Sequence, residues 1–172
     1  MVDYSEKAYT TLQKMQGDNL DVVMCNMLTY ATSSVFAPII RDLNKPMVLV
    51  NMTGSATVFP HEDHFGAIVQ AWYPGQMGGE AAASILFGDF APSGKLPVTF
   101  YDDSEKLPDF TDYSMKNRTY RYTQDNILYP FGFGLTYGTT LVRDLSYENG
   151  IASVTVENPG EERVDDVVAR RC

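Results

Sequence analysis

Two histidines with acidic residues between them are the first residues in this sequence that could do chemistry. His61 and His64 stand three residues apart in the stretch PHEDHFG, with Glu62 and Asp63 between them. On a helix this spacing would bring both imidazoles to one face, where they could bind a divalent metal ion. Pro60 precedes them, so we expect a loop, and no third ligand stands at a fixed spacing. We therefore predict no metal site, with the histidine pair as the weaker alternative.

An aromatic pair followed by glycines is better suited to bind a ligand. Trp72 and Tyr73 end an apolar run, and Gly78 and Gly79 open the alanine-rich stretch that follows. Glycine allows a sharp turn from strand to helix and a close approach of the backbone to a neighbour. Backbone amides at the start of that helix can donate hydrogen bonds to a hydroxyl or a carboxylate. We predict these four residues as binding residues, and the alternative is that the two rings only pack in an interface.

The remaining candidates for catalysis or cofactor binding are weaker. Ser33, Ser34 and Ser55 lack the histidine and aspartate partners of a serine nucleophile. The stretch Thr53–Ser55 follows an apolar run but lacks the further glycines and the lysine of a phosphate-binding loop. We expect no cofactor.

The first half of the chain alternates between helix and strand. Apolar residues spaced four, four and three apart predict a helix from Tyr4 to Met15. Valine-rich runs predict buried strands at Leu20–Cys25 and Pro46–Met52, with a helix at Thr32–Leu43 between them. A helix between two such strands is a βαβ unit, which implies a parallel sheet.

The same alternation continues to about residue 100. We predict a third strand at Ala67–Trp72, a helix at Glu80–Phe87 that ends at Gly88, and a fourth strand at Leu96–Phe100. Beyond these, Asp144–Tyr147 and Ala152–Glu157 alternate like half-exposed strands joined by a hairpin turn. Because two strands are not stable alone, they predict the start of a small β domain.

Composition limits the class of partner. The chain has 172 residues and a formal net charge of −9, which argues against nucleic acid or an anionic membrane as a partner. It has no apolar run of the ~18 residues that a membrane span needs, and its polar N-terminus is no secretory signal. We therefore expect a cytoplasmic location. The two cysteines, Cys25 and Cys172, form no disulfide framework, and we expect Cys25 to act as a small buried apolar residue.

Three stretches in order carry a resemblance to a known family. AIVQAWYPGQMGGEAAASILFGDFAPSGKLPVTF resembles the C-terminal α/β domain of glycoside hydrolase family 3, over about residues 51–160. DYSMKNRTYRY and LYPFGFGLTYGT resemble its continuation toward a fibronectin-like third domain. The resemblance implies a β-glucosidase or β-xylosidase origin and an α/β sandwich that packs against a barrel domain. Trp72 and Tyr73 at the end of a predicted strand are well suited to stack on a sugar face, and the alternative is that both rings fill the interface with the barrel domain.

The first fifty residues resemble a different family. LDVVMCNMLTYATSSVFAPIIRDLNKPMVLV is similar to the N-terminal region of L-arabinose isomerase, most specifically in TYATSSVFAPI. We interpret the chain as a hybrid with four segments: isomerase-like 1–50, glycosidase-like α/β 51–100, an ordered linker 101–140 and a partial fibronectin-like segment 141–172. The expected fold class is therefore α/β, a parallel-sheet α/β sandwich with a C-terminal linker and the start of a truncated fibronectin-like β domain.

The resemblance also implies that the catalytic groups are missing. Retaining glycosidases need two carboxyl groups about 5 Å apart. In the family the nucleophile belongs to the barrel domain, and the acid/base belongs to a segment that is absent or replaced here. The remaining acids stand in expected turns and linkers, among them Asp89, Asp102, Asp103 and Asp112. We expect a β-glycosidase fragment that is inactive alone; the alternatives are a sugar-binding or scaffold module and a sugar isomerase-like domain.

The expected partners follow from the same resemblance. They are carbohydrate and the barrel domain of the parent family. The aromatic residues of the 101–140 linker would have evolved against that domain, so an exposed patch would favour self-association.

Overall fold

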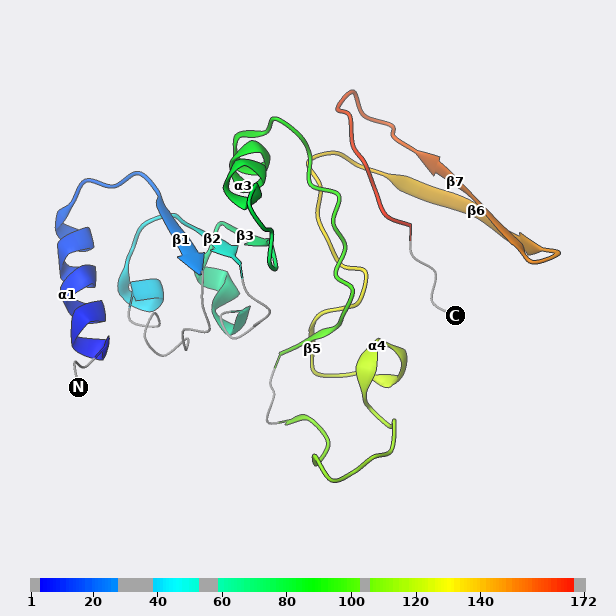
Figure 1. Cartoon of the computed structure of the whole chain (residues 1–172), viewed down its shortest axis with the longest axis horizontal. Coiled ribbons are helices and arrows are strands. Elements are labelled where there is room, and N and C mark those ends of the chain that lie inside the picture. The colour runs from blue at the N-terminus through cyan, green and yellow to red at the C-terminus, as the bar shows by residue number, and fades with distance from the viewer. Residues whose placement is uncertain (1–3, 28–38, 53–58, 103–105, 169–172) are drawn as a thin grey trace. The chain divides into compact units, whose positions relative to one another are not determined.

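The chain forms two compact units in the computed structural model. The structure describes residues 4–27, 39–52, 59–102 and 106–168 (Figure 1). One unit is Met1–Ala82 and the other is Ala83–Cys172. The predicted segment boundaries at residues 50, 100 and 140 concern ancestry rather than compactness, and they stay predictions. Within the described ranges, no helix has the length and apolar character needed to cross a bilayer.

A three-stranded parallel sheet organises the first unit. Its strands are β1 (Val23–Met27), β2 (Met47–Asn51) and β3 (Ala67–Gln70), in that order across the sheet. Both pairings are parallel, which confirms the predicted sheet. The first strand begins later than expected, because Leu20 lies in a turn where its amide donates to the Asp18 carbonyl at 3.1 Å.

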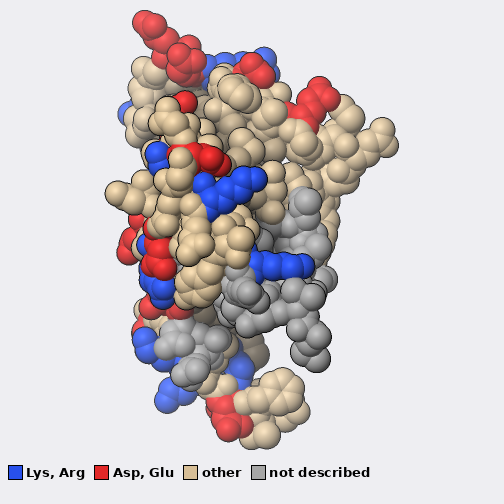
Figure 2. All heavy atoms as spheres, turned by 90° about the vertical axis from the view of Figure 1, so that its left-hand side faces the viewer, with Lys and Arg blue, Asp and Glu red and all other residues tan. Residues whose placement is uncertain are grey.

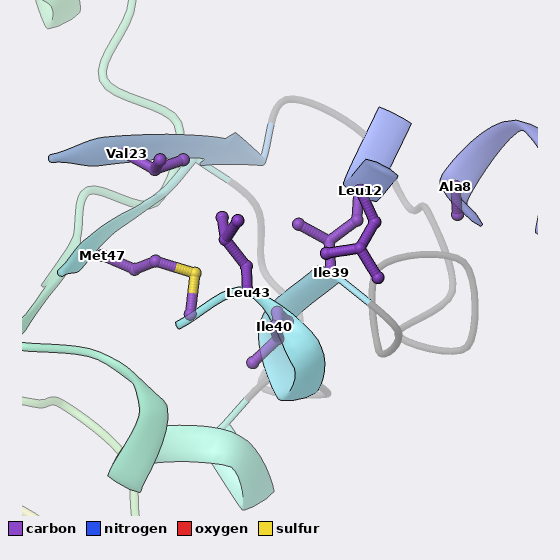
Figure 3. Close-up of a cluster of buried hydrophobic side chains, with 7 residues drawn as sticks. All are labelled: Ala8, Leu12, Val23, Ile39, Ile40, Leu43 and Met47. Atoms are coloured by element: carbon purple, nitrogen blue, oxygen red, sulfur yellow. The ribbon is translucent and has the colours of Figure 1, made fainter. Parts of the chain in front are cut away.

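Helix α1 (Tyr4–Gly17) covers the sheet with the apolar stripe that its sequence predicts. Ala8 and Leu12 are buried on this stripe. They belong to one apolar cluster that draws on α1, the first two strands and a short helical segment at 39–42 (Figure 3), formed by Ala8, Leu12, Val23, Ile39, Ile40, Leu43 and Met47. The predicted helix at 32–43 is thus confirmed only over 39–42, since its earlier part lies outside the described residues.

The central strand is the most deeply buried element. Met47, Leu49, Val50 and Asn51 all have less than 2% of their surface exposed. A strand covered on both faces reads as a continuous apolar run, which explains why β2 shows no alternation in sequence. Its one polar residue, Asn51, stands at its carboxyl end.

Helix α3 (Gly78–Phe87) begins two residues before the predicted Glu80 and ends as expected. Gly88 follows it with φ +83°, the left-handed conformation that favours glycine after a helix. The short η1 helix (Phe59–His64) lies between β2 and β3 in sequence. The boundary between the two units falls within α3, after Ala82.

The prediction of a fourth parallel strand at Leu96–Phe100 was wrong. Only Phe100–Tyr101 is a strand, β4, and it pairs antiparallel with β5 (Ile127–Tyr129). The Leu96 amide donates to the Phe133 carbonyl, and the Leu96 carbonyl accepts from the Gly132 amide, at 2.8 Å each. Both partners lie shortly after β5. Pro97 has no amide hydrogen, so regular strand pairing cannot continue through it.

The predicted hairpin is confirmed. Strands β6 (Leu141–Glu148) and β7 (Ile151–Glu157) are antiparallel and joined by Asn149 and Gly150. Both turn residues have positive φ, as the favoured two-residue hairpin turn requires. Every residue of both strands is exposed.

Candidate functional site

The carboxyl edge of the parallel sheet carries a buried polar contact. Asn51 ends β2 and is 0% exposed. Its side-chain amide donates to the side-chain oxygen Oε1 of Gln70 at 2.7 Å. The Ala71 amide extends the ladder by donating to the Asn51 carbonyl at 2.9 Å. Parallel α/β sheets bind ligands outside this edge. Neither side chain was predicted from the sequence, although each is the one polar residue within an apolar run.

Trp72 and Tyr73 follow directly at the same edge, as predicted. Tyr73 is 65% exposed, whereas Trp72 is half-buried. Trp72 has φ +54°, a conformation that is rare for a bulky residue and that costs about 1–3 kcal/mol. The backbone therefore turns sharply at the end of β3, and this turn sets the direction of both rings.

The predicted glycines differ in what they do. A Cβ added to Gly78 would lie 2.5 Å from the Pro74 Cγ, so this position has room only for glycine. Gly79 has no atom within 4 Å of such a Cβ. Gly75 has φ +69° and accepts a 3.3 Å hydrogen bond from the Gly78 amide, which closes the turn into α3. Gly78 thus fixes packing, while Gly79 leaves the start of the helix open.

The histidine pair lies on η1 rather than in the expected loop. Pro60 is accommodated near the start of this short helix, where a missing amide hydrogen breaks no bond. His64 is exposed, and the side chain of His61 lies outside the described residues. Among the side chains that are described, no three histidine, cysteine, aspartate or glutamate residues group as metal ligands. The structure therefore adds no support to the metal alternative.

Four described aspartates accept hydrogen bonds that favour their ionised form. A hydrogen bond from the Thr111 hydroxyl lowers the pKa of Asp109, and one from the Ser114 amide lowers that of Asp112. The Thr140 hydroxyl does the same for Asp166, and the neighbouring guanidinium for Asp42. A general acid near neutral pH needs the opposite shift. Of the acids expected in turns and linkers, Asp89, Asp102 and Asp112 are exposed and Asp103 lies outside the described residues.

Cys25 matches its prediction as a small, mainly apolar side chain on β1. It is half-buried, and this burial raises the pKa of its thiol. A raised pKa keeps the thiol protonated and therefore unreactive. Cys172 lies outside the described residues.

Two of the motifs that carry the resemblance lie side by side in the second unit. Lys95 of APSGKLP donates from Nζ to the Gly134 carbonyl of YPFGFG at 2.8 Å. A Cβ on Gly134 would collide with the Gly94 carbonyl oxygen, so the close approach of the two segments requires glycine there.

Charged side chains are mixed over the face drawn in Figure 2. Lysine and arginine side chains appear there together with aspartate and glutamate side chains. An interface for nucleic acid instead gathers basic side chains on one face.

The family follows from a match to a protein-family model. The model described as the glycosyl hydrolase family 3 C-terminal domain matches residues 8–137. The chain belongs to this family. The match runs through both motifs above and through the Trp72 turn. It also begins well before residue 50, inside the segment for which we predicted an isomerase origin.

The relatives of this family member are glycosidases by name. A xylan 1,4-beta-xylosidase of Xylanibacter ruminicola is 51% identical over 114 residues, covering 66% of this chain and 13% of that protein. A periplasmic beta-glucosidase of Salmonella typhimurium is 34% identical over 150 residues, covering 75% of this chain and 20% of that protein. The chain therefore spans a fifth or less of the length of these two relatives.

Solved structures support the fold of this family member. DesR, a beta-glucosidase from Streptomyces venezuelae in complex with D-glucose, matches with a TM-score of 0.69 at 24% identity. The match covers 91% of this chain and 24% of that one. A beta-glucosidase from Paenibacillus barengoltzii matches with a TM-score of 0.58 at 21% identity, over 87% of this chain and 20% of that one. The mixed helix and sheet arrangement with its parallel sheet is thus a known one.

Proposed function

We propose that this chain is the non-catalytic part of a β-glycosidase that hydrolyses O-glycosyl bonds of β-xylosides or β-glucosides. The observation that carries the proposal is the family match over residues 8–137. The relative of highest identity among those described above is named for xylan, which favours a xylose-containing substrate.

Four described aspartates lack the upward pKa shift that a catalytic acid needs. Glycosidases pair a carboxylic acid of raised pKa with a second carboxylate. Every resolved pKa shift of a described aspartate is downward, at Asp42, Asp109, Asp112 and Asp166. These groups accept hydrogen bonds from nearby donors and hold no proton to give. We assign the catalytic acids to the barrel domain and the acid/base segment of a full enzyme, as the family resemblance implies.

Sugar contact is the role that we propose for the edge of the sheet. Tyr73 offers an exposed ring, and Trp72 stands beside it in a conformation fixed by the strained turn. Gly79 leaves space at the start of α3, where backbone amides can donate to a sugar hydroxyl. Gly78 packs closely against Pro74 and so stabilises the turn that carries the site.

A hydrolysis assay tests the inactive state. The purified chain is incubated with aryl β-xyloside and β-glucoside, beside a full-length enzyme of the family. We expect no turnover above buffer, because we propose that the acid/base pair belongs to other segments of a full enzyme. Turnover that disappears when one carboxylate of this chain is replaced would overturn the proposal.

A titration tests sugar contact separately. Xylohexaose is added to the chain and to its Tyr73→Ala variant, with Tyr9→Ala of α1 as a control that is 48% exposed. We expect weaker binding only in the Tyr73→Ala variant, by about fivefold or more for the loss of one stacked ring. Equal binding by all three proteins would remove Tyr73 from the site.

The other expectations are kept as parts of this proposal. The exposed hairpin β6–β7 would be completed by further strands of a fibronectin-like domain, and the barrel domain and carbohydrate would be the partners. A cytoplasmic location stays a prediction, and one relative is named as periplasmic; cell fractionation tests it.

An isomerase-like origin of residues 1–50 stays the second hypothesis. Its most specific stretch, TYATSSVFAPI, falls mostly on residues that the structure does not describe. The family match from residue 8 onward favours a single origin instead. Metal-dependent ketose formation from L-arabinose by the purified chain would favour the isomerase.

A further inference from the structure

A shallow hollow lies at helix α4 (Thr119–Tyr122) in the second unit. It has a volume of about 320 Å³ and is lined by Met115, Thr119, Tyr120, Arg121 and Tyr122. Its size is at the lower end of ligand pockets, which suits a single ring rather than a large cofactor. Its lining combines aromatic surface with hydroxyl groups and one guanidinium.

The floor of the hollow is fixed by contacts beneath α4. The Tyr120 ring stacks on Phe131 with 4.5 Å between ring centroids. The Thr119 amide donates to the Tyr101 hydroxyl at 3.1 Å, and the Thr123 amide donates to the Thr119 carbonyl at 3.0 Å. A site held this firmly needs little ordering when a ligand binds.

One arginine orders the loop that leads into α4, whose course is drawn in Figure 1. Nη2 of Arg118 donates to the carbonyl oxygens of Pro108, Asp109 and Asp112, at 3.3, 2.7 and 2.8 Å. Two local turns complete it, in which Asp109 accepts from the Thr111 amide and Asp112 accepts from the Ser114 amide, each at 2.8 Å. The side chains carried by the loop are therefore presented on a fixed backbone.

Two aromatic rings project from this fixed loop into solvent. Phe110 is 89% exposed and Tyr113 is 88% exposed. Exposed aromatic rings on a rigid backbone are favourable binding anchors, because they offer a large apolar area at little cost in conformational entropy. Met115 belongs both to the loop and to the lining of the hollow, so the two features are continuous.

The charges of the loop select among ligands. Asp109 and Asp112 are exposed, and hydrogen bonds from Thr111 and Ser114 lower the pKa of each. Arg118 lies beside both carboxylates and Lys116 is near Asp112, so charges of both signs offset one another and favour a neutral ligand. The carboxylate oxygens can also accept hydrogen bonds from hydroxyl groups. A neutral ligand with many hydroxyls and flat apolar ring faces satisfies both conditions, and a pyranose chain has these properties.

We propose that the loop 108–115 and the hollow at α4 form a second carbohydrate-binding site, which takes a β-linked pyranose chain of at least two units. Phe110 and Tyr113 stack on ring faces, and the hollow receives one sugar unit beside Tyr122 and Arg121. The choice of a β-linked ligand rests on the proposed function, whereas the site consists of other residues than Trp72 and Tyr73.

Calorimetric titration of the full 172-residue chain with xylohexaose and cellohexaose tests the site. The test variant is the pair Phe110→Ala and Tyr113→Ala, and Tyr122→Ala tests the hollow. Phe87→Ala is the matched control, because Phe87 is 83% exposed on α3. Phe110, Tyr113 and Phe87 are largely exposed, and Tyr122 is 46% exposed. Circular dichroism checks that each variant keeps the fold.

We expect the double variant to bind at least about tenfold more weakly, the Tyr122→Ala variant about threefold or more, and the control unchanged. Unchanged binding in both variants, with a loss on replacing Tyr73, would overturn this site and leave the sheet-edge site standing. Weaker binding in the double variant and in Tyr122→Ala, with unchanged binding on replacing Tyr73, would support this site and reject the sheet-edge site. Binding of phosphate or another anion in preference to sugar would also overturn the proposal, as would no binding of either sugar chain.

Discussion

The Nζ of Lys95 lies 3.2 Å from a carboxylate oxygen of Asp166, which joins the APSGKLP motif to the segment after β7. The Thr140 hydroxyl donates to the same carboxylate, and the Val167 amide donates to it at 2.7 Å. The Asp166 side chain is only 11% exposed. One carboxylate thus gathers donors from three separate parts of the second unit.

Replacing Asp166 should loosen this unit. Asp166→Asn removes the charge that Lys95 faces and weakens the bonds to Thr140 and Val167, so we expect the free energy of unfolding to fall by about 1–3 kcal/mol. Urea denaturation measures the change. Asp165→Asn is the matched control, since Asp165 is exposed and adjacent. An equal loss in both variants would mean that Asp166 has no special role.

The same carboxylate should make stability depend on pH. The hydrogen bond from Thr140 is the main cause that lowers the pKa of Asp166 in the folded state. Its contribution is therefore complete above the ordinary aspartate pKa of about 3.9 and is lost as pH falls through the lower folded value. Unfolding measured from pH 7 to pH 2 should show the wild type and Asp166→Asn converging below about pH 4. A constant difference down to pH 2 would contradict this.

The two helix-opening glycines should respond in opposite directions to alanine. Gly78→Ala forces a Cβ against Pro74, and overpacking of this kind costs about 1–3 kcal/mol. Gly79→Ala adds a methyl group in open space and should gain about 0.5–1 kcal/mol, because alanine favours helix. Thermal unfolding of the two variants compares them. Stabilisation by both substitutions would show that Pro74 yields easily.

The polar contact at the sheet edge should appear as a coupling energy. Asn51 is fully buried against Gln70, so Asn51→Ala should destabilise the fold by about 1–3 kcal/mol. A double-mutant cycle with Gln70→Ala isolates the pair, and we expect a coupling of about 0.5–1.5 kcal/mol. Additive effects of the two substitutions would place the cost of the Asn51 change elsewhere.

The uncovered hairpin should promote self-association. Val142 faces Val156 across the strands, and Val154 shares the side of Val156 because alternate residues of a strand point the same way. All three are exposed. Light scattering at rising concentration should therefore show oligomers, and Val142→Thr with Val156→Thr should reduce them. Thr155→Ser on the opposite side is the control, and a monodisperse wild-type monomer would contradict the prediction.

Periodicity in the sequence predicted α1 and the three parallel strands of the first unit, but not η1. The spacing of Ala8 and Leu12 predicted the buried face of α1, and the valine-rich run at 46–52 predicted the central strand. These elements depend mainly on local apolar patterns. The strand at Leu96–Phe100 failed because its pairing partner, β5, stands more than twenty residues later and no local pattern indicates it.

The candidate sites were predicted less completely. Trp72, Tyr73 and the glycines stand out in sequence because their residue types are unusual together. The contact between Asn51 and Gln70 depends on the register of two strands, which sequence alone does not give. The role of Arg118 depends on three carbonyl groups brought together by a folded loop. Every residue has a backbone carbonyl group, so residue types alone do not indicate which carbonyls accept these bonds.

The bonds that join Leu96 to Gly132 and Phe133 also close a ring in the chain. The loop between Leu96 and Gly132 contains more than thirty residues. For a flexible closed loop, each doubling of length costs only about 0.6 kcal/mol of closure entropy. Segments inserted or removed between residues 97 and 131 should therefore leave the hydrogen bonds of Leu96 in place. The stretch that carries Phe110 and Tyr113 is thus a natural position for relatives to differ in length, and for a foreign peptide to be grafted.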